Sequence, residues 1–245
     1  MSENIKKITK AFVVDLDSSK NQSILKPNTR PFNNQAHQVN EVAKKIAEKI
    51  YKLIKDAKHS NDGIILNHNK IKEAFFSPFE PQLKNAQVFL SHSHADRNKA
   101  LEVKDYLESQ TKRKVFIDSL FWDYKDDVLN KLARYDDISK IEDAFTLILR
   151  ESLQDMIEKC PYFVFLQSKN SVSNQGLSCT TYSAWVYEEL KIVNGLIADS
   201  ALQESRIKAM RVSHNITNLL RRFKSISLDS LCKKISFNFI TKDLE

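Results

Sequence analysis

The stretch Thr180-Thr-Tyr-Ser-Ala-Trp-Val-Tyr-Glu-Glu-Leu190 guides the interpretation of the whole chain. It predicts the first turns of a helix that runs to Ile197, because apolar residues recur at the spacing of one buried helical face. Trp185 and Glu189 are four residues apart, so they lie one above the other on the same side of that helix. Glu189 is therefore expected beside the buried face, whereas Glu188 points about 100° away, toward solvent.

The segment before this helix predicts a buried strand. Pro161-Tyr-Phe-Val-Phe-Leu-Gln-Ser168 is a short run of apolar, aromatic and β-branched residues. A strand, a polar loop and a helix form the first part of a βαβ unit, and ligands of such sheets bind beyond the carboxyl ends of the strands. Ser183, Trp185 and Glu189 are therefore expected at that edge, where the helix dipole favours an ionised carboxylate.

Composition excludes several classes of protein. The 245 residues are 42% hydrophobic with only 3 Gly and 5 Pro, which suits an α/β domain with an extension or two small units. The net charge of +7 comes from basic residues spread along the chain, without the aromatic interleaving that indicates nucleic-acid binding. Three isolated cysteines predict neither a disulfide framework nor a zinc site and favour a cytoplasmic protein. No signal peptide or membrane span of about 20 apolar residues is expected.

The pattern divides the chain near residues 80–85, at a connector that contains two prolines. Residues 1–84 are expected to form an N-terminal extension, and residues 85–245 the main domain. Within the extension, Asn34 to His59 predicts one long amphipathic helix that packs within the chain, on a second copy or on a partner. Ala11-Phe-Val-Val14 is compatible with a strand.

The main domain begins with two strands that the sequence predicts to be parallel. Ala86 to Ser91 and Lys114 to Asp118 are separated by a helix, and such crossovers place strands parallel. Asp96 is expected to cap that helix, and Asp118 to cap its strand end. Further helices are expected from Ser139 to Ile157 and from Asn215 to Arg222. Arg206 to Val212 is interpreted as a fourth strand, and Ser225 to Ile235 as a fifth strand or a last helix.

Polar and aromatic side chains follow the first two strands of this domain. Ser91, His92 and Ser93 can hydrogen-bond phosphate or ribose at a strand end, although a capped loop explains them equally well. Phe121 and Trp122 follow the second strand, where they either stack on a base or pack into the domain. The remaining histidines lack metal-ligand spacing, and no Gly-rich phosphate loop occurs, so neither a metal nor those nucleotide folds are expected.

Three segments together resemble the TIR (Toll/interleukin-1 receptor) domain family, most of all its bacterial members. They are Val88-Phe-Leu-Ser-His-Ser-His-Ala-Asp96, Val115-Phe-Ile-Asp118 and Ser183-Ala-Trp-Val-Tyr-Glu-Glu-Leu190. The third is similar to the Ser-x-Trp-x-x-x-Glu-Leu pattern of the family. The resemblance covers roughly residues 86 to 235 and implies a flavodoxin-like fold, an α/β parallel sheet flanked by helices.

The resemblance also implies an activity. TIR enzymes cleave NAD between nicotinamide and ribose, as hydrolases or as cyclases and transferases that make signalling nucleotides, and NAD is their substrate rather than a cofactor. Glu189 maps onto the catalytic glutamate. Substrate contacts are then expected from seven residues: Ser91, His92, Ser93, Phe121, Trp122, Ser183 and Trp185.

The same resemblance predicts partners and a setting. It implies bacterial antiphage defence in the cytoplasm, self-assembly of TIR domains and an effector that is reached through the nucleotide product. Neither a membrane nor nucleic acid is an expected partner. The alternative is a non-catalytic TIR scaffold that signals by assembly.

Overall fold

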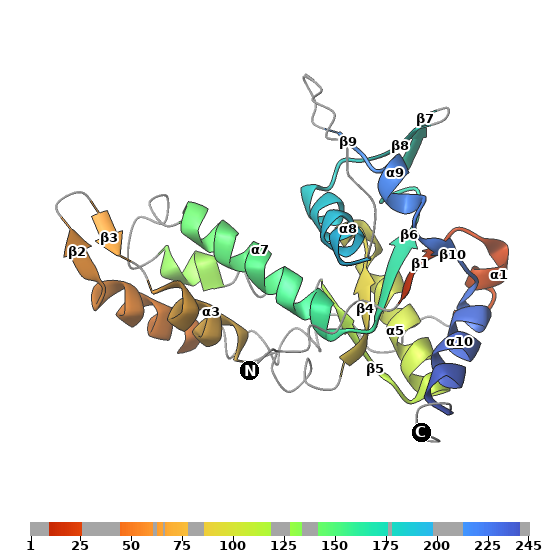
Figure 1. The fold of residues 1–245 in the computed structure, drawn as a ribbon, viewed down its shortest axis with the longest axis horizontal. Coiled ribbons are helices and arrows are strands. Elements are labelled where there is room, and N and C mark those ends of the chain that lie inside the picture. The colour runs from red at the N-terminus through yellow and green to blue at the C-terminus, as the bar shows by residue number, and fades with distance from the viewer. Residues whose placement is uncertain are drawn as a thin grey trace. The chain divides into compact units, whose positions relative to one another are not determined.

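A five-stranded parallel sheet organises the larger part of the chain in the computed structural model (Figure 1). The structure describes residues 10–25, 45–60, 63–65, 67–77, 86–118, 128–133, 142–175, 178–197 and 213–240. In spatial order the sheet strands are β10 (Lys224–Ser225), β1 (Lys10–Asp15), β6 (Tyr162–Gln167), β4 (Ala86–Ser91) and β5 (Lys114–Ile117). Helices flank this sheet, so the predicted α/β class with a parallel sheet is confirmed.

The remaining described elements are helices and two small antiparallel sheets. The helices are α1 (Ser19–Gln22), α3 (His68–Phe76), η1 (His94–Asp96), α5 (Arg97–Thr111), α7 (Glu142–Lys159), α8 (Ala184–Leu196), α9 (Thr217–Leu220), α10 (Leu228–Ile240) and the segments 45–55 and 128–132. One small sheet pairs β2 (Lys58–Ser60) with β3 (Gly63–Ile65). The other contains β7 (Ser173–Gln175), β8 (Ser178–Thr181) and β9 (His214–Asn215).

The position of β1 differs from the expectation that residues 1–84 form an extension outside the main domain. It pairs in parallel with β6 along its whole length, from Lys10 opposite Tyr162 to Asp15 opposite Gln167. It also pairs with β10 on its other side. Ala11 to Val14 are all buried, as a strand covered on both faces requires. The apolar run near the N-terminus is therefore an interior strand of the sheet.

The strand order explains which position β1 occupies. From the β5 edge, the strands that follow residue 85 are arranged β5, β4, β6, which is the beginning of the flavodoxin-like order 2-1-3-4-5. The fourth position is filled by β1, from the N-terminal segment, and the fifth by β10. The expected strand from Arg206 to Val212 lies outside the described residues. Of the two alternatives for Ser225 to Ile235, the helix is correct, because α10 begins at Leu228.

Aromatic side chains fill the core beside the sheet. The ring of Phe89 on β4 stacks on Phe163 of β6 with a centroid separation of 5.7 Å, and it lies 5.7 Å from Phe116 on β5. Phe163 in turn meets Phe223 edge to face. These rings come from neighbouring parallel strands and the segment before β10, so they stabilise the strand order that brings β4, β5 and β6 together.

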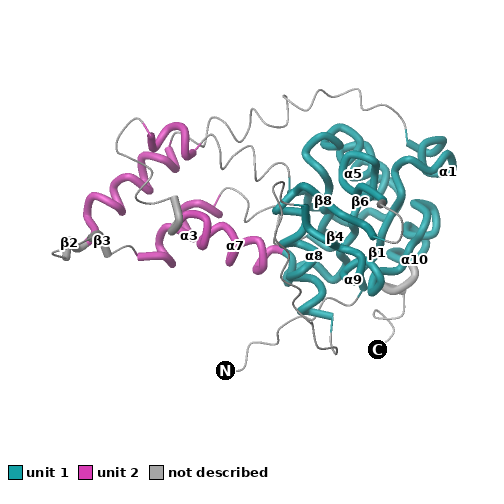
Figure 2. The backbone as a smooth tube through the Cα atoms, turned by 90° about the horizontal axis from the view of Figure 1, so that it is seen from above, with its two compact units in different colours: residues 1–28, 86–118, 157–245 teal, residues 29–85, 119–156 magenta. Residues whose placement is uncertain are grey.

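The chain divides into two compact units (Figure 2). Unit 1 contains Met1–Asn28, Ala86–Asp118 and Ile157–Glu245, and unit 2 contains Thr29–Asn85 and Ser119–Met156. This division differs from the single boundary expected near residue 85. All five strands of the sheet belong to unit 1. The N-terminal segment belongs to the same unit because its strand β1 pairs with β6.

Unit 2 contains the described part of the long amphipathic helix. Residues 45–55 are helical, and the expected inner face is buried at Ile46, Ala47, Ile50 and Ile54. The helix ends before His59, because β2 begins at Lys58 and pairs with β3. The first part of the expected helix, residues 34–44, lies outside the described residues. Among the described helices, none is both long and apolar enough to cross a membrane.

Candidate functional site

α8 carries Glu189 and begins later than the sequence suggests. Thr180 belongs to β8, where it pairs with Ser173 on one side and Asn215 on the other. β-branched threonines favour such extended backbone. The helix starts after Ser183, whose hydroxyl oxygen accepts a hydrogen bond from the backbone N–H of Val186 at 3.2 Å. Ser183 is therefore the N-cap of α8.

Glu189 lies on the buried face of α8 rather than beside it. Its side chain is 0% exposed, and neither carboxyl oxygen makes a hydrogen bond of normal geometry. Burial raises the pKa of Glu189 well above its ordinary value, and the neighbouring Asp118 raises it further, while the Ser91 hydroxyl lowers it. These neighbours place the carboxyl near the carboxyl ends of β4 and β5, since Ser91 ends β4 and Asp118 follows β5.

His92 and Asp118 complete this group of buried side chains. The His92 ring lies with Nδ1 2.9 Å from the backbone oxygen of Ser93. A carbonyl oxygen only accepts, so Nδ1 carries the hydrogen of this bond. The other ring nitrogen, Nε2, faces Asp118 Oδ1 at 3.3 Å, with both side chains buried. We call Ser91, His92, Asp118 and Glu189 the strand-end cluster.

The strand-end cluster contains several buried polar atoms without a well-formed hydrogen bond. Five buried atoms lack a hydrogen bond of normal geometry: His92 Nε2 and Asp118 Oδ1, which face each other, and Ser91 Oγ, Glu189 Oε1 and Glu189 Oε2. Each unsatisfied buried group costs about 1–3 kcal/mol. Such a concentration is found where a protein sacrifices stability for function. Within the described ranges no group of three or more acidic, histidine or cysteine side chains is arranged to hold a metal ion.

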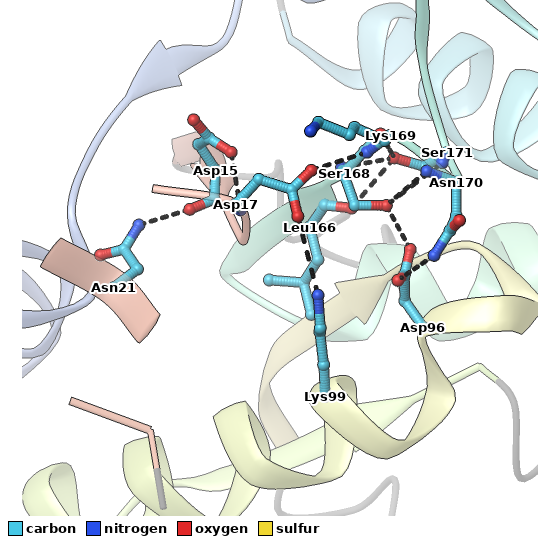
Figure 3. Close-up of polar contacts among 10 residues, drawn as sticks. All are labelled: Asp15, Asp17, Asn21, Asp96, Lys99, Leu166, Ser168, Lys169, Asn170 and Ser171. Atoms are coloured by element: carbon cyan, nitrogen blue, oxygen red, sulfur yellow. Dashed lines mark hydrogen bonds and ion pairs between the residues drawn. The ribbon is translucent and has the colours of Figure 1, made fainter. Parts of the chain in front are cut away.

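A second group of polar contacts holds the loop after β4 against the loop after β6 (Figure 3). The Ser168 hydroxyl donates to Asp96 Oδ2, and Asn170 Nδ2 donates to Asp96 Oδ1 at 2.8 Å. Asp17, which follows β1, accepts from the backbone N–H of Lys169 at 2.9 Å. These contacts connect the carboxyl ends of β4, β6 and β1, and β4 and β6 flank the point where the strand order reverses.

Asp96 and Asp118 differ from their expected roles. Asp96 occupies the N-cap position of α5, but its side chain makes no capping hydrogen bond and is buried against Ser168 and Asn170. Asp118 does not cap its strand but lies in the strand-end cluster. Both were detectable as acids at the ends of predicted parallel strands or just beyond. No signal in the sequence identified the partners of these acids, because the partner of Asp96, Ser168, lies 72 residues further along the chain.

The expected substrate-binding residues separate into three groups. Ser91 and His92 lie in the strand-end cluster, and Ser93 is buried next to them. Ser183 serves as the cap of α8, and Trp185 is half-buried on the first turn of the same helix. Phe121 and Trp122 lie outside the described residues.

Comparison of the chain with models of protein families, with curated proteins and with solved structures finds no match. The fold and the cluster therefore define only a class: a parallel α/β protein with a buried acidic group at the carboxyl edge of its sheet.

Proposed function

We propose that this protein is an NAD-cleaving enzyme of the TIR type, with Glu189 as its catalytic residue. The observation that carries the proposal is the strand-end cluster. The glutamate that the TIR resemblance selects is buried beside a second acid, a hydroxyl and an imidazole at the ligand-binding edge of a parallel sheet.

The proposed reaction breaks the bond between the nicotinamide nitrogen and C1′ of its ribose. Nicotinamide carries a positive charge in NAD, so it leaves as a neutral molecule with the bonding electrons and needs no general acid. Positive charge develops on the ribose, as in glycoside hydrolysis, and an ionised Glu189 stabilises it. Water then forms the new bond to C1′ and releases a proton, or a nitrogen of the adenine forms it and gives a cyclic product.

Ser91 and His92 are suited to orient the ribose. The Ser91 hydroxyl makes no hydrogen bond in the cluster, and His92 Nε2 faces Asp118 Oδ1 at 3.3 Å, so a rearrangement that admits a substrate can offer both groups to its hydroxyls. Asp118 Oδ1 faces Nε2 and the backbone oxygen of Ser93 binds Nδ1, so these two contacts hold the ring in place. In this proposal Asp118 is a positioning residue and Glu189 the catalytic one.

Burial sets a condition on this activity. Glu189 is 0% exposed, and a substrate must contact it, so catalysis requires a rearrangement that opens the cluster. The raised pKa keeps the carboxyl protonated at a pH where exposed glutamates are ionised. A cationic substrate next to the carboxyl favours its ionised form, so substrate binding and activation of Glu189 are coupled. We place the trigger for opening in self-assembly of TIR domains, in antiphage defence, with an effector that responds to the product.

A non-catalytic TIR scaffold is the second candidate, and the complete burial of Glu189 favours it. In that case the unpaired cluster contributes to a structural switch without turnover. The two candidates differ in what happens to NAD.

The test is incubation of concentrated full-length protein with NAD, with products separated by chromatography and identified by mass spectrometry. Glu189→Gln is the test variant. Glu188→Gln, which removes the same charge from the preceding residue, is the matched control. We expect the wild type and Glu188→Gln to consume NAD and Glu189→Gln to lose at least a hundredfold in rate, as for loss of a main stabilising group. Equal turnover by all three proteins rejects Glu189 as catalytic, and absence of turnover under crowding supports the scaffold.

A further inference from the structure

Three lysines gather around Phe12, away from the strand-end cluster. Lys10 is two residues before Phe12 on β1, so the two side chains point to the same face of the sheet. Lys224 on β10 pairs in register with Phe12, which places its side chain on that face as well. Neighbouring strands are about 4.8 Å apart and alternate residues about 6.7 Å apart, so the two lysines start about 8 Å from each other, within reach of two extended side chains.

The third lysine comes from a different part of the chain. Lys234 lies on α10, and its Nζ is 5.4 Å from the centroid of the Phe12 ring. Cation–π attraction to the ring face holds the ammonium group there. Burial lowers the pKa of Lys234, and the charges of Lys224 and Lys10 lower it further. This effect agrees with the register of β1 and β10, which brings Lys10 and Lys224 toward the Phe12 ring.

Among the described residues, no carboxylate forms an ion pair with any of these three lysines. The next residue on α10 provides a contrast, because Lys233 Nζ binds Asp229 Oδ2 at 2.7 Å. Three converging positive charges that no acid among the described residues neutralises repel one another and destabilise the fold slightly. A bound anion would remove this repulsion.

We propose that Lys10, Lys224 and Lys234 form a binding site for a small anion with two adjacent phosphate groups, such as a free diphosphate or the diphosphate of a nucleotide. Lysine is a compact point charge with three donors, which suits phosphate oxygens. Flexible lysine side chains that start about 8 Å apart can converge on an anion a few ångströms long. Long nucleic acids are disfavoured, since binding them rests on many phosphate contacts spread over a surface.

This site is independent of the proposed NAD cleavage. Lys10 and Lys224 are the first residues of their strands, whereas the strand-end cluster lies at the carboxyl ends of β4 and β5. The two sites therefore lie at opposite ends of the parallel strands of unit 1. An anion bound here would strengthen the connection between β1, β10 and α10.

The experiment is isothermal titration of full-length protein with sodium pyrophosphate, without divalent cations, at constant ionic strength. The test variant is Lys224→Ala/Lys234→Ala, and Lys233→Ala is the matched control on the same helix. Loss of two surface charge interactions accounts for roughly a two- to thirtyfold loss of affinity in the double variant, with little change in the control. ADP-ribose in a second titration separates a nucleotide diphosphate from free pyrophosphate.

Thermal unfolding without ligand gives a second readout. Removing Lys234 relieves the repulsion but also removes its cation–π contact with Phe12, so Lys234→Ala is expected to melt at about the same temperature as the wild type. Pyrophosphate should raise the melting temperature of the wild type and of Lys233→Ala more than that of the double variant. Absence of binding of both pyrophosphate and ADP-ribose by the wild type, or equal losses in the double variant and the control, would overturn the proposal.

Discussion

Replacing Glu189 with glutamine should make the protein more stable at neutral pH and leave it nearly unchanged at low pH. Burial raises the pKa of Glu189 in the folded protein well above its value in the unfolded chain, and Asp118 adds to this effect. The folded state therefore keeps the proton at a pH where the unfolded state has released it. This contribution to stability is fully present below the unfolded-state pKa and is lost as the pH rises toward the folded-state pKa.

The size of the effect follows from the linkage between protons and folding. One proton changes the free energy of unfolding by up to about 1.4 kcal/mol per pH unit between the two pKa values. Between about pH 5 and about pH 6.5, the free energy of unfolding of the wild type should therefore fall by up to about 2 kcal/mol relative to that of Glu189→Gln. Glutamine has the shape of the protonated carboxyl and no proton to release, so the difference between the two proteins isolates this one group.

The assay is urea unfolding at several pH values between 5 and 7.5, followed by circular dichroism. Glu188→Gln is the charge-matched control, and the gain of Glu189→Gln should exceed that of the control increasingly as the pH rises. On an Asp118→Asn background the gain should be smaller, because one cause of the raised pKa is absent. A difference between wild type and Glu189→Gln that stays constant with pH would refute the interpretation of Glu189 as a buried, proton-holding carboxyl.

Two further predictions concern the supports of the site. Asp96→Ala should lower the free energy of unfolding by about 2–4 kcal/mol, because it leaves the buried Ser168 hydroxyl without its acceptor. Asn170 is an exposed partner of the same carboxylate, so Asn170→Ala should cost less than about 1 kcal/mol. Chemical unfolding of both variants checks this, and equal costs would contradict it. Ser183→Ala should cost about 0.5–2 kcal/mol through loss of the α8 cap, and Ser183→Asn should restore most of it. Thermal unfolding decides the cap role, and a stable Ser183→Asn protein with weakened NAD turnover would show a substrate role in addition.

Local pattern was sufficient for much of the fold. The apolar runs that became β4, β5 and β6 and the helical spacing of α5, α7 and α8 are visible in the sequence, because strand and helix periodicities depend only on near neighbours. The same spacing placed Trp185 and Glu189 on one side of a helix. The position of Glu189 at a strand-end edge also followed, since chain order constrains where a helix after a strand begins.

Tertiary structure alone decided which segments pair. β1 entered the sheet between β6 and β10, although its short apolar run is separated from β6 by about 150 residues and no local signal selects that partner. Asp96 found Ser168, and Asp118 joined Glu189, for the same reason: the contact depends on strand order rather than on sequence spacing. Residue types and periodicity therefore determined the elements and the candidate glutamate. The burial and charge state of that glutamate depend on groups that only the folded sheet brings together, because desolvation and Coulomb interaction act through space.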